Sequence, residues 1–194
     1  MNAEQGQPKK KKHSIKKIHS DLKHAYEQGR WNIEHLDKAW ERKGGNTALF
    51  DFITIGTSAK TPDDILRFIK LPVFRCNLLV DVRLNPYNQY VPAWNEKNLK
   101  NVCQSINIQY SHRPEFGVPK EKRVELTTKK ISEAQFFEWY DKEVLKGPQT
   151  DFLKEVMKNN HPAFLCTELG PVFCHRHRIA MFLEKELGLI GYDI

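Results

Sequence analysis

Residues 163–178 read AFLCTELGPVFCHRHR, and this stretch decides the fold. It opens with a short apolar run that ends at Cys166 and is typical of a buried strand. A turn-type segment around Gly170–Pro171 follows, and from Cys174 to about Leu187 the sequence is patterned as a helix. A strand, a loop and a helix N-terminus form the usual ligand site of an open α/β sheet, at the carboxyl end of the strand.

The side chains that carry chemistry gather in the second half of this stretch. They are Cys166, Glu168, Cys174, His175, Arg176, His177 and Arg178. At a helix N-terminus, the unpaired N–H groups and the helix dipole favour the thiolate form of Cys174. We expect His177 and Arg178, three and four residues further on, to flank Cys174 on one helix face. A nucleophile beside a base is typical of covalent catalysis, so Cys174, Glu168 and His175 are candidate catalytic residues.

The same residues leave two other interpretations open. Zinc accepts four of these side chains as ligands, namely Cys166, Cys174, His175 and His177. The stretch lacks the paired C-x-x-C of a zinc finger, so no cofactor is predicted and zinc remains the alternative. Arg176 and Arg178 at a helix N-terminus instead suit a phosphate group. The C-x5-R spacing of a phosphatase loop is absent, because Ile179 stands five residues after Cys174.

Strand and helix patterns alternate along the rest of the chain. The expected elements are a strand from Phe50 to Ile55, a helix capped by Thr61, a strand over 78–80, a helix from Asn95 through Cys103, a strand over 106–110, a long basic loop over 112–130, and helices over 132–144 and 150–157. Strands that alternate with helices predict an α/β fold, with a mostly parallel sheet and helices on both faces.

Two other predicted strand ends carry polar groups. Asp81 and Arg83 follow the second strand, so Asp81 joins the catalytic candidates and Arg83 the ligand-binding ones. The alternative is a local ion pair that holds a loop. Gly56 and Ser58 follow the first strand and offer backbone N–H groups and a hydroxyl to a ligand, although the G-x-G-x-x-G and P-loop patterns are absent.

The charge of the chain is concentrated at its N-terminus. Residues 1–24 hold seven basic and two acidic residues, whereas residues 45–194 hold 20 basic and 18 acidic ones. We therefore expect a disordered basic tail over 1–14, a helical hairpin extension over 15–45 and an α/β domain over 46–194. A basic tail favours nucleic acid as a partner, through contacts to phosphate.

Other features of the sequence exclude several classes of protein. There is no run of about 18 apolar residues, so no membrane span is expected. The N-terminus lacks the apolar region of a secretory signal. The four cysteines are too few and too scattered to predict a disulfide framework. Together these observations predict a cytoplasmic protein.

Several short motifs occur in the order found in a known family. They are TIGTS at 54–58, LVDVR at 79–83 followed by Pro86, PAWN at 92–95, IQY at 108–110, EFG at 115–117, LCTE at 165–168 followed by Pro171, and CHR at 174–176. Over residues 50–190 the chain resembles the domain-of-unknown-function family 488, whose members are bacterial and archaeal. Thr57 stands where the family has a histidine, and Gly170 where it usually has an acidic residue.

The resemblance implies an α/β domain with a polar crevice, but no reaction. The residues that it assigns to the crevice are Asp81, Arg83, Cys166, Glu168, Cys174, His175 and Arg176. We therefore expect an enzyme or binding domain that acts on a nucleotide, a nucleic acid or another phosphate-bearing ligand. The alternative is a nucleic-acid-binding accessory protein that uses its basic tail, with the Cys/His cluster structural or zinc-binding.

Overall fold

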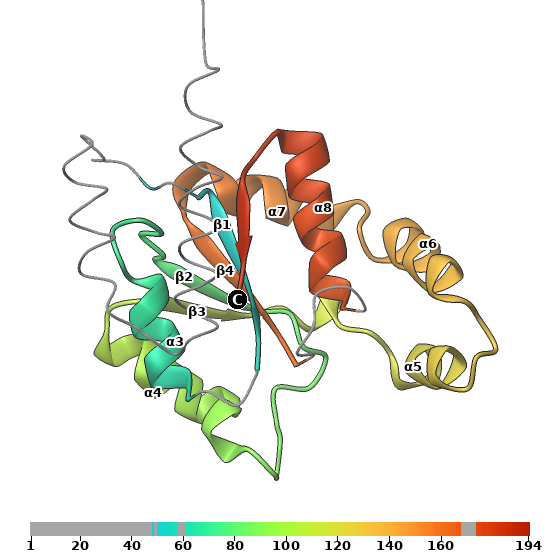
Figure 1. Ribbon diagram of the computed structural model, residues 1–194, viewed down its shortest axis with the longest axis horizontal. Helices are drawn as coiled ribbons and strands as arrows, with labels where there is room; N and C mark the ends of the chain where they lie inside the picture. The colour runs from blue at the N-terminus through green and yellow to red at the C-terminus, as the bar shows by residue number, and fades with distance from the viewer. Residues whose placement is uncertain (1–47, 49, 58–60, 168–173) are drawn as a thin grey trace, which may run out of the picture. The chain divides into compact units, whose positions relative to one another are not determined.

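The computed structural model describes residues 48, 50–57, 61–167 and 174–194 (Figure 1). The chain divides into two compact units, residues 1–49 and 50–194. Apart from Ala48, all the described residues belong to the second unit. The predicted tail and hairpin therefore lie outside the described residues. Within the described part of the chain, no helix is long and apolar enough to cross a membrane.

Five parallel strands form the sheet of the second unit. They are β1 (Phe52–Gly56), β2 (Leu78–Asp81), β3 (Gln109–His112), β4 (Pro162–Cys166) and β5 (Gly191–Asp193). Their order across the sheet is β3-β2-β4-β1-β5, and every neighbouring pair is parallel. The predicted α/β fold is confirmed. The sequence does not predict β5, and it places the third strand too early, because Ile106 is the C-cap of the preceding helix.

Helices cover both faces of the sheet, as predicted. They are α3 (Pro62–Ile69), α4 (Glu96–Ser105), α5 (Lys120–Thr127), α6 (Glu133–Glu143), α7 (Pro148–Asn159) and α8 (His175–Leu187), with short 3-10 helices η1 (Pro92–Trp94) and η2 (Pro114–Phe116). Figure 1 shows α3 and α4 on one side of the sheet, and α7 and α8 on the other.

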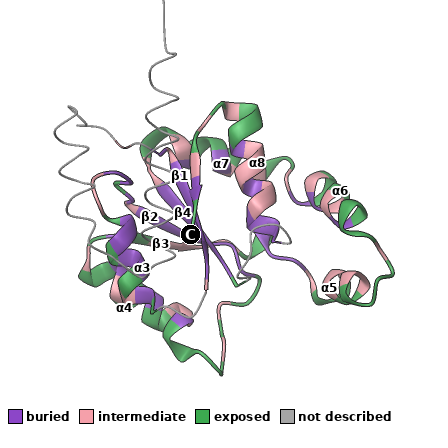
Figure 2. Ribbon diagram, in the orientation of Figure 1, coloured by how far each residue is buried: buried purple, intermediate pink, exposed green. Residues whose placement is uncertain are grey.

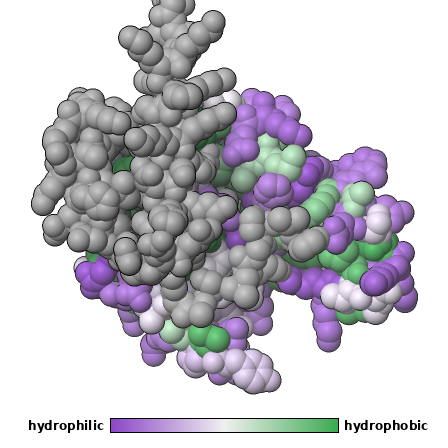
Figure 3. Space-filling view, viewed as in Figure 1, coloured by the Kyte–Doolittle hydropathy of each residue, from purple (hydrophilic) through white to green (hydrophobic). Residues whose placement is uncertain are grey.

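The stretch 112–130, predicted as a loop, contains η2 and α5. No residue of α5 is buried, so the helix lacks the apolar face by which a sequence pattern reveals it. Helices α5 and α6 extend away from the sheet and are largely exposed or half-buried (Figures 1 and 2). On the face shown in Figure 3, apolar side chains gather in this region, where Leu126, Ile131 and Ala134 line an open hollow.

Local hydrogen bonds fix where two of the helices begin. Thr61 is the N-cap of α3, and its hydroxyl accepts a hydrogen bond from the backbone N–H of Asp64. Ser132 caps α6 in a capping box with Gln135, in which each side chain bonds the other residue's backbone N–H. Both satisfy N–H groups that a helix cannot bond internally, which is why these predicted helix starts are confirmed.

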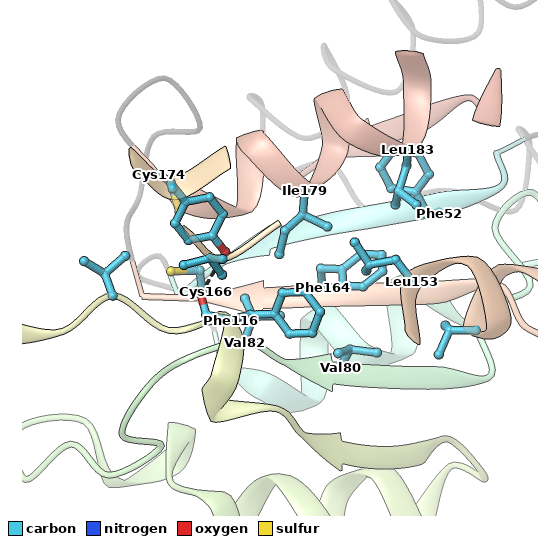
Figure 4. Close-up of a cluster of buried hydrophobic side chains, with 14 of the residues drawn as sticks. Phe52, Val80, Val82, Phe116, Leu153, Phe164, Cys166, Cys174, Ile179 and Leu183 are labelled. Atoms are coloured by element: carbon cyan, nitrogen blue, oxygen red, sulfur yellow. Dashed lines mark hydrogen bonds between the residues drawn. The ribbon is translucent and has the colours of Figure 1, made fainter. Parts of the chain in front are cut away.

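The face of the sheet toward α7 and α8 carries a hydrophobic core (Figure 4). Its strand residues alternate along β1, β2 and β4, and they pack against helix residues; the set includes Phe52, Val80, Phe164, Leu153, Ile179 and Leu183. Alternation directs their strand neighbours Ile53, Leu79 and Leu165, which are also buried, to the opposite face. Each large apolar side chain buried in this way stabilises the fold by about 1.5–3 kcal/mol.

The topology gives β4 a special position. It lies between β1 and β2, whose following helices α3 and α4 cover one face of the sheet. The chain leaves β4 for α8, which covers the other face (Figure 1). Neighbouring strands whose connections depart to opposite faces define a switch point, and ligands of open α/β sheets bind outside the carboxyl ends of the strands there. In this fold the carboxyl end of β4 is Cys166.

Candidate functional site

Two cysteines approach each other at the end of β4. Cys166 is the last residue of this strand, and its carbonyl oxygen accepts a hydrogen bond of 3.1 Å from the backbone N–H of Thr57. Cys174 is the N-cap of α8, with an extended backbone. Both side chains are buried and belong to the core on the α8 face, where Figure 4 shows them at one end of the core beside Phe116 and Val82.

His175 completes a group of three metal-ligating side chains. Its Nδ1 atom lies 3.5 Å from Cys166 Sγ, and its Nε2 atom lies 3.3 Å from the carbonyl oxygen of Val82. The ring packs against the ring of Tyr140 at 5.6 Å between centroids. The ligand atoms of Cys166, Cys174 and His175 all lie within 4.8 Å of one another. We call these three residues the thiol–imidazole cluster.

Arg176 connects this cluster to the C-terminal strand. Its backbone N–H and its Nη1 donate to Cys174 Sγ, at 3.4 and 3.5 Å, and its Nε donates to Asp193 at 3.3 Å. The Asp193 carboxylate also accepts a hydrogen bond from the Thr54 hydroxyl. Arg176 is fully buried, so this pairing with Asp193 offsets the cost of removing its charge from water.

The structure does not place His177 and Arg178 beside Cys174 as expected. Arg178 donates to the Asp141 carboxylate of α6, 2.9 Å from Nε, and its guanidinium lies over the ring of Phe137. His177 is half-buried and lies outside the thiol–imidazole cluster. The expectation places Cys174 within the helix, whereas Cys174 precedes it with an extended backbone and so does not share a helix face with these two residues.

Asp81 and Arg83 form a second polar cluster. Arg83 Nε and Nη2 donate to the two oxygens of Asp81, at 2.8 and 2.6 Å, and Nη2 also donates to the carbonyl oxygen of Trp94. The Tyr110 hydroxyl donates to Asp81 Oδ2 at 2.8 Å. We call Asp81, Arg83 and Tyr110 the ion-pair cluster. It ties the segment that follows β2 to η1, which is the role of a local ion pair that holds a loop.

Burial and charge set the pKa values of this second cluster. Burial lowers the pKa of Arg83, but the hydrogen bonds and negative charge of Asp81 outweigh that effect, so its pKa is raised. Burial, followed by the charge of Asp81, raises the pKa of Tyr110. The guanidinium therefore stays charged and the phenol stays neutral, which preserves the hydrogen bonds of the cluster.

The two clusters lie on opposite faces of the sheet. Asp81 is paired with Leu165 in the register of β2 and β4, so it points away from the face on which Cys166 lies. The sequence and the resemblance put all these residues in one crevice. The structure brings Cys166, Cys174, His175 and Arg176 together and directs Asp81 to the other face. Arg83 pairs with Asp81 but remains within electrostatic range of Cys166.

The remaining predicted residues are placed only in part. Gly56 is paired with Cys166 of β4. The Gly56 N–H donates to the carbonyl oxygen of Ile194, so this N–H already has a backbone partner within the chain. Ser58 and Glu168 lie outside the described residues. The Thr57 hydroxyl donates to the carbonyl oxygen of Thr167, which joins the segments that follow β1 and β4.

The other two cysteines have different surroundings. Cys76 and Cys103 are buried, and burial raises the pKa of each thiol to about 12. Neither belongs to the group of metal-ligating side chains found among the described residues. They are ordinary buried thiols, and this makes them internal controls for the thiol–imidazole cluster.

Sequence reasoning missed three residues that support the site: Thr54, Tyr140 and Asp193. Asp193 lies in β5, a strand of three residues that is too short for a clear alternation pattern. The signal that marks β5 is Gly188, which ends α8 in a left-handed conformation and leaves the last residues free to return to the sheet. Thr54 and Tyr140 read as ordinary strand and helix residues, so no local pattern reveals their roles.

Comparison with known proteins gives one family. The model of the family described as "Domain of unknown function DUF488" matches residues 64–183. This range includes both cysteines of the thiol–imidazole cluster, His175 and Arg176. No curated protein and no solved structure matches the chain.

Proposed function

The chain belongs to the DUF488 family, and on that premise we propose that its α/β unit binds and acts on a phosphate-bearing ligand, a nucleotide or nucleic acid, at the carboxyl end of β4. The observation that carries this proposal is the position of the thiol–imidazole cluster. Cys166 ends the strand at which the sheet connections change face, and Cys174, His175 and Arg176 open the helix that follows. This is where open α/β sheets hold their ligands.

The charge at the start of α8 favours an anionic ligand. Helices α3, α4, α5, α6 and α7 each carry an acidic residue in the first turn, whereas α8 carries none. Its first residues are His175, Arg176 and His177 instead. A helix N-terminus already bears partial positive charge, so basic residues there make a nearby anion favourable.

Ligand titration tests this proposal. We expect calorimetry of the full chain with inorganic phosphate, nucleoside phosphates and short oligonucleotides to find at least one ligand. We expect Cys174→Ser and Arg176→Ala each to lower the affinity for that ligand by roughly tenfold or more, since each substitution removes a group from the start of α8. Cys103→Ala, which changes a buried thiol outside the cluster, is the matched control. A panel without any ligand, or variants with undiminished affinity, would contradict the proposal.

The basic tail supports a second function, that of a nucleic-acid-binding accessory protein. Seven of the chain's basic residues lie within residues 1–24. If these residues make the main interaction, their deletion should abolish most oligonucleotide binding. The slope of the logarithm of the binding constant against the logarithm of the salt concentration should become shallower by about 0.9 for each phosphate that is no longer neutralised. Binding at the end of β4 should survive this deletion, so one experiment separates the two functions.

A further inference from the structure

We propose that the thiol–imidazole cluster is a zinc site with three protein ligands, Cys166 Sγ, Cys174 Sγ and His175 Nδ1. The proposal concerns the cofactor of this chain and goes beyond the binding of a phosphate-bearing ligand. It stands on the spacing of the three ligand atoms, the hydrogen-bond partner of the imidazole and the hydrogen bonds that the Cys174 sulfur accepts.

The spacing of the ligand atoms fits a tetrahedral ion. Zinc binds sulfur at roughly 2.3 Å and imidazole nitrogen at roughly 2.0–2.1 Å, so in a tetrahedron sulfur and nitrogen are roughly 3.5 Å apart and two sulfurs roughly 3.8 Å apart. Cys166 Sγ and His175 Nδ1 are 3.5 Å apart. All three ligand atoms lie within 4.8 Å of one another, so a single ion reaches all of them with small side-chain shifts.

One nitrogen of the His175 imidazole has the kind of hydrogen-bond partner that metal-binding histidines use. Its Nε2 lies 3.3 Å from the carbonyl oxygen of Val82, a group that can only accept a hydrogen bond. An Nε2–H that donates to this carbonyl leaves the lone pair on Nδ1. Cys166 Sγ lies almost equally far from the two ring nitrogens, 3.5 Å from Nδ1 and 3.6 Å from Nε2, so the ring turns to direct Nδ1 at an ion beside the sulfur. A ligand histidine usually gives its other N–H to a carbonyl or carboxylate in this way, which fixes the tautomer and the ring.

Arg176 provides hydrogen bonds and charge balance around Cys174. Two N–H groups of Arg176 donate to Cys174 Sγ, and such bonds stabilise a sulfur that carries negative charge. Asp193 balances the guanidinium. A divalent ion balances the charge of two thiolates, which lowers the desolvation cost of burying them.

Rigid elements hold the two cysteine ligands in place. Cys166 belongs to β4 and is paired with Gly56 of β1 at a central position of the sheet. The backbone of Cys174 caps α8, since its carbonyl oxygen accepts a hydrogen bond from the His177 N–H at 3.0 Å. Thiolate and imidazole ligands together favour zinc over the hard cations magnesium and calcium.

Among the described residues the site has three protein ligands, and three ligands leave the fourth position of a tetrahedral ion for water or another oxygen, as in catalytic zinc sites. On the proposed function, that oxygen belongs to the phosphate group of the ligand. Of the alternative ligand set that the sequence gives, three residues, Cys166, Cys174 and His175, are grouped in the described part of the chain. His177 lies outside the cluster, because residues two apart on a helix do not face the same side.

Metal analysis and cobalt substitution test the site on the full chain, produced without a histidine tag. We expect about one zinc ion per chain after purification. After removal of the metal with a chelator, Co²⁺ should give thiolate-to-cobalt charge transfer in the near ultraviolet and the intense visible bands of tetrahedral cobalt. Cys174→Ser should weaken metal binding more than about 100-fold and reduce the charge-transfer intensity. Cys103→Ala, the matched control, should leave both unchanged.

The cobalt spectrum of the unaltered chain keeps the test valid if Cys174→Ser fails to fold. Absence of both zinc and charge transfer would overturn the proposal, as would metal that is lost in Cys103→Ala and kept in folded Cys174→Ser. The result is independent of the ligand titration. A chain that binds zinc but no phosphate-bearing ligand supports the metal site and contradicts the proposed function, and the reverse outcome contradicts only the metal site.

Discussion

Two buried polar clusters lie at the carboxyl edge of one sheet, on opposite faces, and they differ in kind. The ion-pair cluster consists of charged and hydroxyl groups that satisfy one another: the Asp81 carboxylate accepts from both Arg83 and Tyr110. The thiol–imidazole cluster consists of soft donors gathered around one point. The first completes its interactions within the chain, and the second has the composition of a ligand set.

The difference bears on which of the two clusters is the better candidate for a functional site. Both clusters follow buried strands, both contain or adjoin an arginine, and both motifs belong to the family resemblance. What separates them is the chemistry of their side chains and the face of the sheet on which these side chains lie. Asp81 and Val82 are neighbours, yet Asp81 anchors the first cluster whereas the carbonyl of Val82 orients His175 in the second.

We expect the largest effect from a substitution that disrupts the ion-pair cluster. Asp81→Asn leaves the buried Arg83 guanidinium without its counter-charge, which should lower the free energy of unfolding by about 3–5 kcal/mol. Urea denaturation measures this decrease. Asp63→Asn, which removes an exposed ion pair with Arg67, should leave the midpoint nearly unchanged. Equal effects of the two substitutions would contradict the structural role of Asp81.

A smaller effect is expected when the support of the thiol–imidazole cluster is weakened. Arg176→Gln removes the guanidinium that donates to Cys174 Sγ while it keeps the backbone N–H donor. Removal of such a supporting hydrogen bond should reduce zinc affinity by about 10–100-fold, measured by competition with a chromophoric chelator. Arg178→Gln changes the next arginine, which bonds Asp141, and should leave zinc affinity as it is.

Tyr140→Phe tests whether stability and metal binding are separate, because it should change stability without changing a proposed zinc ligand. The buried Tyr140 hydroxyl donates to the carbonyl oxygen of Phe116 at 2.8 Å. Its removal should lower the free energy of unfolding by about 1–3 kcal/mol. The phenyl ring still packs against His175, so zinc content should not change. A decrease in the zinc content of the folded variant would assign Tyr140 to the site rather than to the core.

The smallest expected effect concerns the cysteine pair outside both clusters. The pKa of Cys76 is about 12 in the folded chain against an ordinary value of 9.0, so its contribution to stability is complete below about pH 9 and is lost as the pH rises toward 12. In urea titrations between about pH 9 and pH 10.5, stability should fall by at most about 1.4 kcal/mol per pH unit from this thiol. Cys76→Ala should make the slope of stability against pH shallower. An unchanged slope would contradict the raised pKa of Cys76.

Much of this arrangement follows from the sequence, because local chemistry decides it. Thr61 marks the start of α3 as an N-cap, the pattern over 132–144 predicts α6, and the apolar run before Cys166 predicts β4. The sequence also indicates that the candidate site residues gather in the stretch 163–178. It does not reveal β5 or α5, since the first is short and the second buries nothing.

The composition of the site depends on tertiary structure, which local patterns do not contain. The separation of Asp81 from Cys166 follows from strand register, and the partner of Arg176 lies seventeen residues away, in β5. The direction of Arg178 depends on Asp141 of α6. In each case a contact distant in sequence decides which of several chemically plausible neighbours a side chain meets.

The central claim, that soft donors at the end of β4 form a metal site, has one direct measurement. Zinc K-edge X-ray absorption of the purified full-length chain reports the atoms around the ion. We predict two sulfurs at about 2.3 Å, one imidazole nitrogen at about 2.0–2.1 Å and one further light atom. A shell of nitrogen and oxygen alone, or of four sulfurs, would contradict the claim, since neither fits the set Cys166, Cys174 and His175.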